Sequence, residues 1–236
     1  MRVLAFDTAT PATAVALRDL GTGEGAVDLE ARDDPPAGAR PGHARRLLPL
    51  IEDLLAQGGG WPEVERIAVG VGPGTFTGLR IGVATAHALA RSRGLELVGV
   101  STLASLAAAA REAHPGVPIL AAIDARRGQA FVAGWSATAD PAGAEPSLAP
   151  VPLAPAELAH AAAALGHAAV AIGDGALKFR DVLGAAGVAV PAAGSVLHRV
   201  SAREHCRLAV ACRPDRADAV LPAYLRLADA ERNRPG

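Results

Sequence analysis

The densest group of residues suited to chemistry is the glycine-rich stretch GVGPGTFTGLRIG, residues 70–82. Backbone N–H groups at glycine turns and helix N-termini attract anions, so one hypothesis is a phosphate site. However, the chain contains no GxxxxGK[ST] pattern, and Pro73 removes one N–H donor from the loop. The alternative hypothesis is a tight turn from a buried strand into a closely packed helix, capped by the hydroxyl of Thr75 or Thr77.

Two aspartates stand at the ends of predicted buried strands, Asp7 in LAFDTA and Asp124 in LAAIDA. An alternating hairpin strand follows each of them, and later in each half a strand enters a glycine turn and a helix, VGVGPGTFTGLR and then VAIGDGALKFR. The same order of parts therefore occurs twice. This predicts a duplicated α/β fold with mixed sheets flanked by helices. We expect a first domain over residues 1–101 and a smaller second domain over 102–236. The C-terminal segment of the second domain can pack back on the first.

Two such domains across a cleft form the plan of the actin-like (ASKHA) ATPases and sugar kinases. In that plan Asp7 approaches metal and phosphate, while Gly173 and Gly175 belong to a nucleotide-binding turn. Nucleotide turnover is disfavoured because Asp124 is followed by ARRG and not by a second Gly-Gly phosphate loop. We therefore expect a degenerate nucleotide site, no cofactor, and a fold that tolerates Asp7→Ala. The alternative is an independent nucleotide-dependent enzyme of the sugar-kinase type.

Other catalytic chemistry lacks its residue patterns. No two of the seven histidines stand at i, i+4, so neither HExxH nor another HxxxH helix motif exists, and we expect no metal site and no catalytic residue. Cys206 and Cys212 do not form a CxxC pair and are expected to be idle thiols. Arg126 and Arg127 beside Asp124 are compatible with an anion site or with a surface ion pair.

Composition limits the class of protein. The formal net charge of -1 over 236 residues disfavours strong binding of tRNA or DNA by this chain alone. The start MRVLAFDTA has no signal-peptide pattern, and no apolar run approaches the roughly 20 residues of a membrane span, so we expect a soluble cytoplasmic protein. The Pro/Ala-rich stretch 139–155 is predicted to be a loop, and a short strand is predicted around Tyr224.

Two predicted helices carry apolar or small residues at helical spacing. The first, from about residue 46, presents Leu47, Leu50 and Leu54. The second, over about 78–92, has Gly78, Gly82 and Ala86 in one i, i+4 row, which forms a shallow groove for another helix. We hypothesise that both helices dock with two helices of a partner in a four-helix interface. The alternative is that both are buried within one domain.

The segments LAFDTATPATAVAL, GVGPGTFTGLRIGVATAHALA, GVSTLASLA and IDARRGQAF, followed by PAYLR, resemble in this order the motifs of the TsaB family. The resemblance implies an actin-like fold without catalytic competence of its own. It implies pairing with TsaD, the metal-bearing transferase subunit, and work with the ATPase TsaE. That assembly transfers threonylcarbamoyl to adenosine 37 of tRNAs that read codons beginning with A. Without TsaD, the apolar patch of the two helices should bind a second copy of the chain, so we expect a homodimer when the chain is alone. The near-neutral net charge leads us to expect contact with tRNA only through the complex.

The chain departs from the family pattern at two places. Family members often carry HSE at the start of the first helix, where this chain has HAR over residues 43–45. They often read DARRGEVY, where this chain has DARRGQAF. Both departures affect expected surface or partner-facing positions more than the core.

Overall fold

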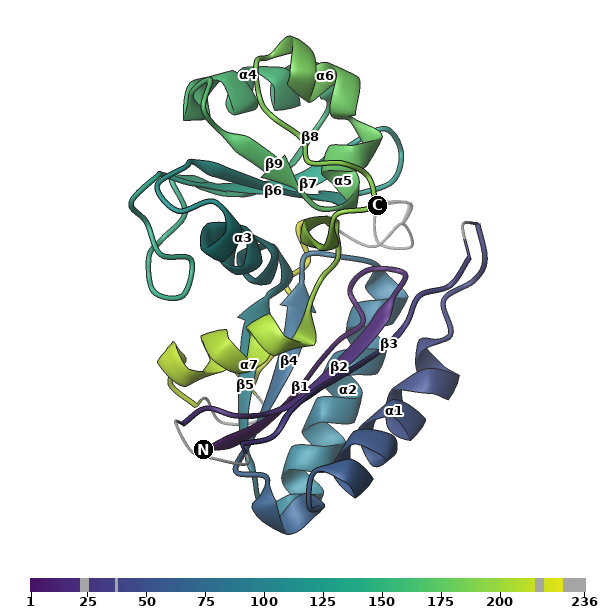
Figure 1. The fold of residues 1–236 in the computed structure, drawn as a ribbon. Coiled ribbons are helices and arrows are strands. Elements are labelled where there is room, and N and C mark those ends of the chain that lie inside the picture. The colour runs from purple at the N-terminus through teal and green to yellow at the C-terminus, as the bar shows by residue number, and fades with distance from the viewer. Residues whose placement is uncertain (22–25, 37, 215–218, 227–236) are drawn as a thin grey trace.

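The computed structural model describes residues 1–21, 26–36, 38–214 and 219–226. Two mixed β-sheets lie one above the other, and helices flank each of them (Figure 1). The chain crosses from the first sheet to the second at Ser101–Thr102 and returns near residues 200–202. This arrangement confirms the predicted α/β class with two mixed sheets.

The first sheet has the strand order β3-β2-β1-β4-β5. Its strands are β1 (Arg2–Asp7), β2 (Thr13–Asp19), β3 (Asp28–Asp33), β4 (Arg66–Gly72) and β5 (Glu96–Ser101). Strand β1 pairs antiparallel with β2 and parallel with β4, which places the carboxyl ends of β1 and β4 at the same edge. Asp7 and the glycine-rich loop therefore meet at this edge.

The second sheet repeats the pattern with the strand order β8-β7-β6-β9. Its strands are β6 (Ile119–Asp124), β7 (Ala130–Trp135), β8 (Leu148–Leu153) and β9 (Val170–Ile172). Strand β6 pairs antiparallel with β7 and parallel with β9, as β1 does with β2 and β4. The duplication predicted from the two aspartate-ended strands is confirmed.

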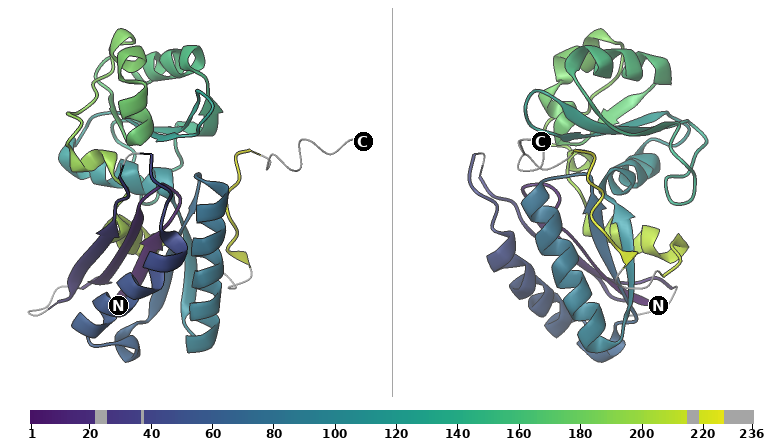
Figure 2. Two further views of the ribbon diagram at one scale, coloured as in Figure 1. Left: turned by 90° about the vertical axis from the view of Figure 1, so that its right-hand side faces the viewer. Right: turned by 180° about the vertical axis from the view of Figure 1, so that it is seen from behind.

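Helices cover both faces of both sheets. On the first sheet, α1 (His43–Gln57) and α2 (Phe76–Arg93) lie side by side on one face, and α7 (Ala202–Ala211) returns from the second half to cover the other (Figures 1 and 2). Helix α3 (Thr102–Ala113) lies between the two sheets and packs against β6. The outer face of the second sheet is covered by α4 (Pro155–Leu165), α5 (Asp174–Lys178) and α6 (Arg180–Ala185). The 3₁₀ turns are Trp61–Glu63 and Val196–His198.

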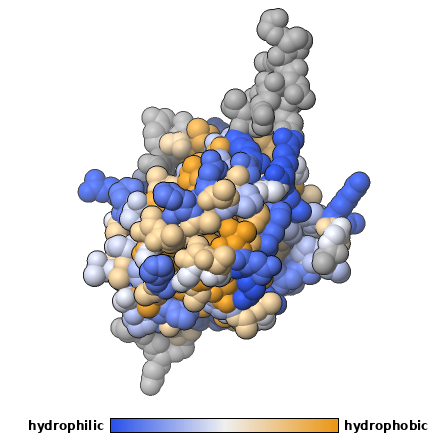
Figure 3. Space-filling view, turned by 90° about the horizontal axis from the view of Figure 1, so that it is seen from above, coloured by the Kyte–Doolittle hydropathy of each residue, from blue (hydrophilic) through white to orange (hydrophobic). Residues whose placement is uncertain are grey.

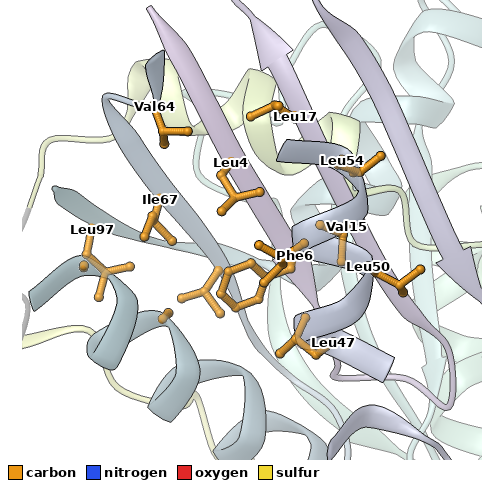
Figure 4. Close-up of a cluster of buried hydrophobic side chains, with 14 of the residues drawn as sticks. Leu4, Phe6, Val15, Leu17, Leu47, Leu50, Leu54, Val64, Ile67 and Leu97 are labelled. Atoms are coloured by element: carbon orange, nitrogen blue, oxygen red, sulfur yellow. The ribbon is translucent and has the colours of Figure 1, made fainter. Parts of the chain in front are cut away.

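The core beneath α1 and α2 is aliphatic, because aromatic residues make up only 3% of the chain. Figure 4 shows the leucines of α1 directed at side chains of β1 and β2, among them Phe6 and Val15. The i, i+3, i+4 spacing of these leucines puts them on one helix face, and burying that face holds α1 to the sheet.

Three expectations of local structure were wrong. Residues 148–153 form strand β8, whose Pro150 and Pro152 are tolerated because β8 is an edge strand and needs no N–H donor toward a further strand. No strand forms around Tyr224 in the described segment 219–226, where Ala223 N donates to the Val71 carbonyl and Tyr224 N donates to the Pro222 carbonyl within the segment. Helix α2 begins at Phe76, and Thr75 precedes it without a capping bond from its hydroxyl.

The alanine-rich helices of the second half give its outer surface a mixed character. Figure 3 looks down on this half, and hydrophobic side chains gather near the centre of the view among hydrophilic ones. No helix in the described ranges combines the length and the apolar character that a membrane crossing requires.

Candidate functional site

The glycine-rich loop wraps the turn that follows β1. At four of its glycines a Cβ would come closer than 3.0 Å to atoms of Asp7, Thr8 or Ala9, and these are Gly70, Gly74, Gly78 and Gly82. The contact is held by hydrogen bonds from Thr8 Oγ1 to the Gly78 carbonyl and from Thr75 N to the Ala9 carbonyl, both 2.7 Å long. The glycines therefore admit the β1–β2 turn of the same chain, and the second hypothesis for this loop fits the geometry.

Asp7 is engaged on both carboxylate oxygens. Its Oδ1 accepts a bond from Ala9 N at 2.7 Å, and its Oδ2 accepts one from Thr102 Oγ1 at 2.8 Å. The same Oδ2 lies 3.0 Å from Nε2 of His205 on α7. The other ring nitrogen of His205 lies 3.1 Å from the Ser201 carbonyl, so both ring nitrogens have polar partners. In actin-like ATPases the carboxylate at this position approaches metal and phosphate. Here it is hydrogen-bonded to groups of the chain itself.

The environment of Asp7 favours its charged form. Burial by itself would raise the pKa of this carboxyl, but the hydrogen bond and charge of His205, with the bonds from Ala9 and Thr102, lower it below its ordinary value. Because Asp7 is buried and hydrogen-bonded on both carboxylate oxygens, replacing it would leave buried polar partners unpaired. We therefore expect Asp7→Ala to destabilise the fold, contrary to the expectation from the sequence.

In the second half, the glycine turn at residues 173–175 and Asp124 make contacts different from those of the first half. Gly173 has φ 99°, and a Cβ on it or on Gly175 would collide with the backbone of β6, so both glycines serve the approach of α5 to the sheet. Asp174 between them accepts a bond from Asp124 N at 3.0 Å. Burial, together with the nearby charge of Asp124, raises the pKa of Asp174. Asp124 in turn binds Lys178 Nζ at 2.7 Å.

The three residues of the expected degenerate nucleotide site do not line the cleft between the two halves. A cleft of about 190 Å³ lies between the halves, with walls that include Thr10, Arg32, Asp174 and His198. Pockets for drug-sized ligands typically exceed about 300 Å³. The residues lining this cleft do not include Asp7, Gly173 or Gly175. Among the described residues, no group of three or more His, Cys, Asp or Glu side chains is arranged to hold a metal ion.

The six residues expected to contact a partner all point into the chain. Leu47, Leu50 and Leu54 are 2%, 6% and 3% exposed. Ala86 is fully buried, and Gly78 and Gly82 abut Thr8. The structure thus corrects their assignment: they fix α1 and α2 to the first sheet, as the alternative had it. Other side chains on these helices form the surface that remains open to a partner.

A second groove, of about 270 Å³, brings together residues that are far apart in sequence. Phe76 begins α2, Arg126 and Arg127 occupy the β6–β7 turn, and Tyr224 and Arg226 come from the end of the described chain. The arginine pair alone was visible as a candidate in the sequence. Nothing in the sequence marked Phe76 or Tyr224 as a site residue, because only the return of the C-terminal segment places Tyr224 beside Phe76.

Comparison with known proteins identifies the family. Residues 35–146, a little under half of the chain, match the family described as TsaD: tRNA N6-adenosine threonylcarbamoyltransferase. The tRNA threonylcarbamoyladenosine biosynthesis protein TsaB of Escherichia coli is 40% identical over 136 residues, 57% of this chain and 55% of that protein. Its counterpart in Haemophilus influenzae is 37% identical over 132 residues, 56% of this chain and 52% of that protein. The matched region thus spans about half the length of these relatives.

Solved structures extend the likeness over nearly the whole chain. A Pseudomonas aeruginosa protein with similarity to the peptidase YeaZ superposes with a TM-score of 0.74 at 30% identity, covering 95% of this chain and 99% of its own. The chain belongs to the TsaB family. YeaZ of P. aeruginosa superposes with a TM-score of 0.73 at 28% identity, covering 94% of this chain and all of its own. Membership of the TsaB family brings with it the actin-like fold, which the two repeated sheets display.

Proposed function

We propose that this TsaB-family chain is a non-catalytic subunit of the assembly that makes threonylcarbamoyladenosine at position 37 of tRNAs reading codons that begin with A. The names of its TsaB relatives support the pathway. The observation that carries the non-catalytic role is the engagement of Asp7 by Ala9, Thr102 and His205. Asp7 is 1% exposed, so groups of the chain itself, and not solvent, surround the carboxylate that would have to meet a metal ion or phosphate.

We further propose that the chain has TsaD and TsaE as partners and forms a homodimer when it is alone. We also propose that it is cytoplasmic and contacts tRNA only through the complex. Its two domains would meet near Ser101. The match of residues 35–146 to the TsaD family suggests a related fold for TsaD. Two related folds are able to pair through equivalent helices, as two copies of one chain do in a symmetric dimer.

The outward faces of α1 and α2 support a revised contact surface. On α2, Ala84 and Ala88 are exposed one turn apart, and Thr77 and Arg80 continue this face toward the N-terminus. On α1, Leu48 is 49% exposed, a high value for a large apolar side chain. Small residues in one row permit close helix packing, and an exposed leucine supplies apolar area. We define the docking face as Leu48, Thr77, Ala84 and Ala88.

Reconstitution tests the proposal. Purified TsaD, TsaE, the enzyme that forms threonylcarbamoyl-adenylate and an unmodified tRNA are incubated with and without this chain, and modified adenosine is quantified by mass spectrometry. We expect modification only when the chain is present, and no ATP hydrolysis by the chain alone. Equal modification without the chain would overturn the role as a subunit. Robust metal-dependent ATP hydrolysis by the chain alone, lost in Asp7→Asn, would favour the sugar-kinase alternative.

A further inference from the structure

The second groove has aromatic residues on one wall. The Arg80 guanidinium lies 3.8 Å from the centre of the Phe76 ring, and the rings of Phe76 and Tyr224 are 5.2 Å apart. Arg80 Nε also donates to Tyr224 Oη at 3.2 Å. Phe76 is 37% exposed and Tyr224 is 41% exposed. The result is a fixed layer of one cation and two rings with apolar surface open to solvent.

The segment that carries Tyr224 is tied along α2. His87 Nε2 lies 2.8 Å from the Val220 carbonyl, and Ala223 N donates to the Val71 carbonyl at 2.7 Å. Figure 2 shows this last described segment, in yellow, running beside α2. Because contacts at several points hold the segment, the Tyr224 ring keeps its place beside Phe76 and does not need to be ordered by a ligand.

The opposite wall is the arginine turn between β6 and β7. Arg126 and Arg127 have φ 61° and 51°, a left-handed conformation uncommon for arginine, and both are exposed. Hydrogen bonds from Gln129 N to the Arg126 carbonyl and from Ala125 N to the Gln129 carbonyl close the turn. Side chains that leave a closed turn of this kind start from a fixed backbone position, and strained backbone of this kind concentrates at functional sites.

The groove concentrates positive charge in a chain whose net charge is -1. Arg226 reaches the same wall, where its Nη1 donates to the Ala125 carbonyl at 2.9 Å and its guanidinium lies 5.6 Å from the Phe131 ring centre. Its Nη2 is buried without a hydrogen-bond partner. The carboxylate of the turn, Asp124, accepts bonds from Lys178 Nζ and from Arg126 N.

We propose that this groove binds a single-stranded segment of RNA, with a base stacked on the Phe76–Tyr224 layer and adjacent phosphates on the Arg126–Arg127 turn. Aromatic faces with nearby guanidinium groups are how proteins hold unpaired nucleotides, because every base has a stacking face and every linkage has a negative charge. An acidic peptide would use the arginines but leave the aromatic layer without a stacking partner. The inference rests on the proposed function, which supplies the RNA: the anticodon loop around adenosine 37.

The local charge of the groove is too small for strong RNA binding by the chain alone. A few phosphate contacts give a modest, salt-sensitive affinity, whereas a partner that holds the rest of the tRNA adds its own contacts. The groove therefore contributes to binding within the complex, and the test is made there.

The experiment measures binding of a fluorescein-labelled anticodon stem–loop RNA to the complex of this chain with TsaD by anisotropy, between 50 and 200 mM salt. One variant is Arg126→Gln/Arg127→Gln, and another is Phe76→Leu/Tyr224→Leu. The matched control, Arg40→Gln/Arg213→Gln, removes the same charge from exposed positions outside the groove. Size-exclusion chromatography and circular dichroism establish that each variant is folded and paired with TsaD.

We expect the aromatic variant to weaken binding by roughly 5- to 150-fold, the effect of losing one stacked base. The arginine variant should reduce the slope of log affinity against log salt by about 1.4, since two single-strand phosphate contacts are lost. The control should match the wild type. Groove variants indistinguishable from the control, in a complex that binds the RNA, would overturn the inference and leave the proposed subunit role intact.

Three further outcomes are decisive. A chain that forms no complex with TsaD would contradict the proposed function itself, and the inference with it. Displacement of the RNA by millimolar AMP as effectively as by unlabelled stem–loop would assign the groove to a free nucleotide. Equal affinity for an RNA duplex of the same length, lost in the same variants, would exclude recognition of a single strand.

Discussion

His205 Nε2 lies 3.0 Å from Asp7 Oδ2, and both side chains are sealed from solvent, at 0% and 1% exposure. Helix α7 carries His205, and β1 ends at Asp7, so the pair joins the returning C-terminal helix to the first strand. Thr102, at the start of α3, donates to the same carboxylate oxygen. One buried carboxylate thus connects the two places where the chain passes between the halves.

Replacing Asp7 should destabilise the protein strongly. Removal of the Asp7 carboxylate leaves the buried donors Ala9 N and Thr102 Oγ1 without their acceptor, and each buried polar group left unpaired typically costs about 1–3 kcal/mol. We expect Asp7→Ala to lower the free energy of unfolding by this amount in urea denaturation followed by circular dichroism. The control Asp181→Ala, at an exposed position on α6, should change it by less than about 0.5 kcal/mol. A loss below about 1 kcal/mol in Asp7→Ala would mean that the pair is not a structural link.

The buried carboxyls Asp7 and Asp174 should respond to pH with opposite sign. The pKa of Asp7 is lowered in the folded protein, so its contribution to stability is complete above the unfolded pKa of about 3.9 and is lost as pH falls through the folded value. The pKa of Asp174 is raised, so its ionisation costs stability as pH rises through its folded value.

Asn variants separate these two effects. At pH 7, Asp7→Asn should be less stable than the wild type, whereas Asp174→Asn, whose amide oxygen is able to accept the same bond from Asp124 N, should be equally stable or more stable. The measurement is urea denaturation at intervals from pH 3 to pH 7. If Asp174→Asn were the less stable variant at pH 7, the assigned direction for Asp174 would be wrong.

Two glycines within helices should give opposite results when replaced by alanine. A Cβ at Gly78 of α2 would collide with the Thr8 carbonyl, whereas a Cβ at Gly184 of α6 would meet no atom within 4 Å. We expect Gly78→Ala to cost about 1–3 kcal/mol through overpacking, and Gly184→Ala to add about 0.5–1 kcal/mol through helix propensity. Thermal and urea unfolding measure both. Similar values for the two variants would argue against close packing of the loop on the β1–β2 turn.

Ala86 and Ala88 lie on α2 two residues apart, the first fully buried and the second exposed. Ala86→Arg should therefore unfold or aggregate, because it drives a charge into the core. Ala88→Arg should stay folded but lose self-association and TsaD binding in size-exclusion chromatography, because it places a long charged side chain on the docking face. A folded Ala88→Arg that still dimerises and binds TsaD would place the interface on another surface.

The sequence alone determined the repeated fold. Asp7 and Asp124 each end a run of buried residues that precedes an alternating hairpin, and this local pattern specifies strand pairing whatever lies elsewhere in the chain. Strand β8 was missed because its prolines resemble a loop, and only its position at the sheet edge makes them acceptable. The resemblance to the TsaB family was also visible in the sequence, since each family motif is a contiguous segment.

Only the tertiary structure decided what the marked residues do. A leucine stripe such as Leu47, Leu50 and Leu54 has the same spacing whether it faces a partner or its own sheet, and the burial of both helices on the first sheet settled that choice. A strand-end aspartate such as Asp7 has the same sequence pattern whether it binds a metal ion or is a buried structural anion. The structure places His205, 198 residues away, within hydrogen-bond distance of the Asp7 carboxylate, which supports the structural role. Tyr224 joined Phe76 for the same reason: contacts between distant segments depend on how the chain returns, which local spacing does not encode.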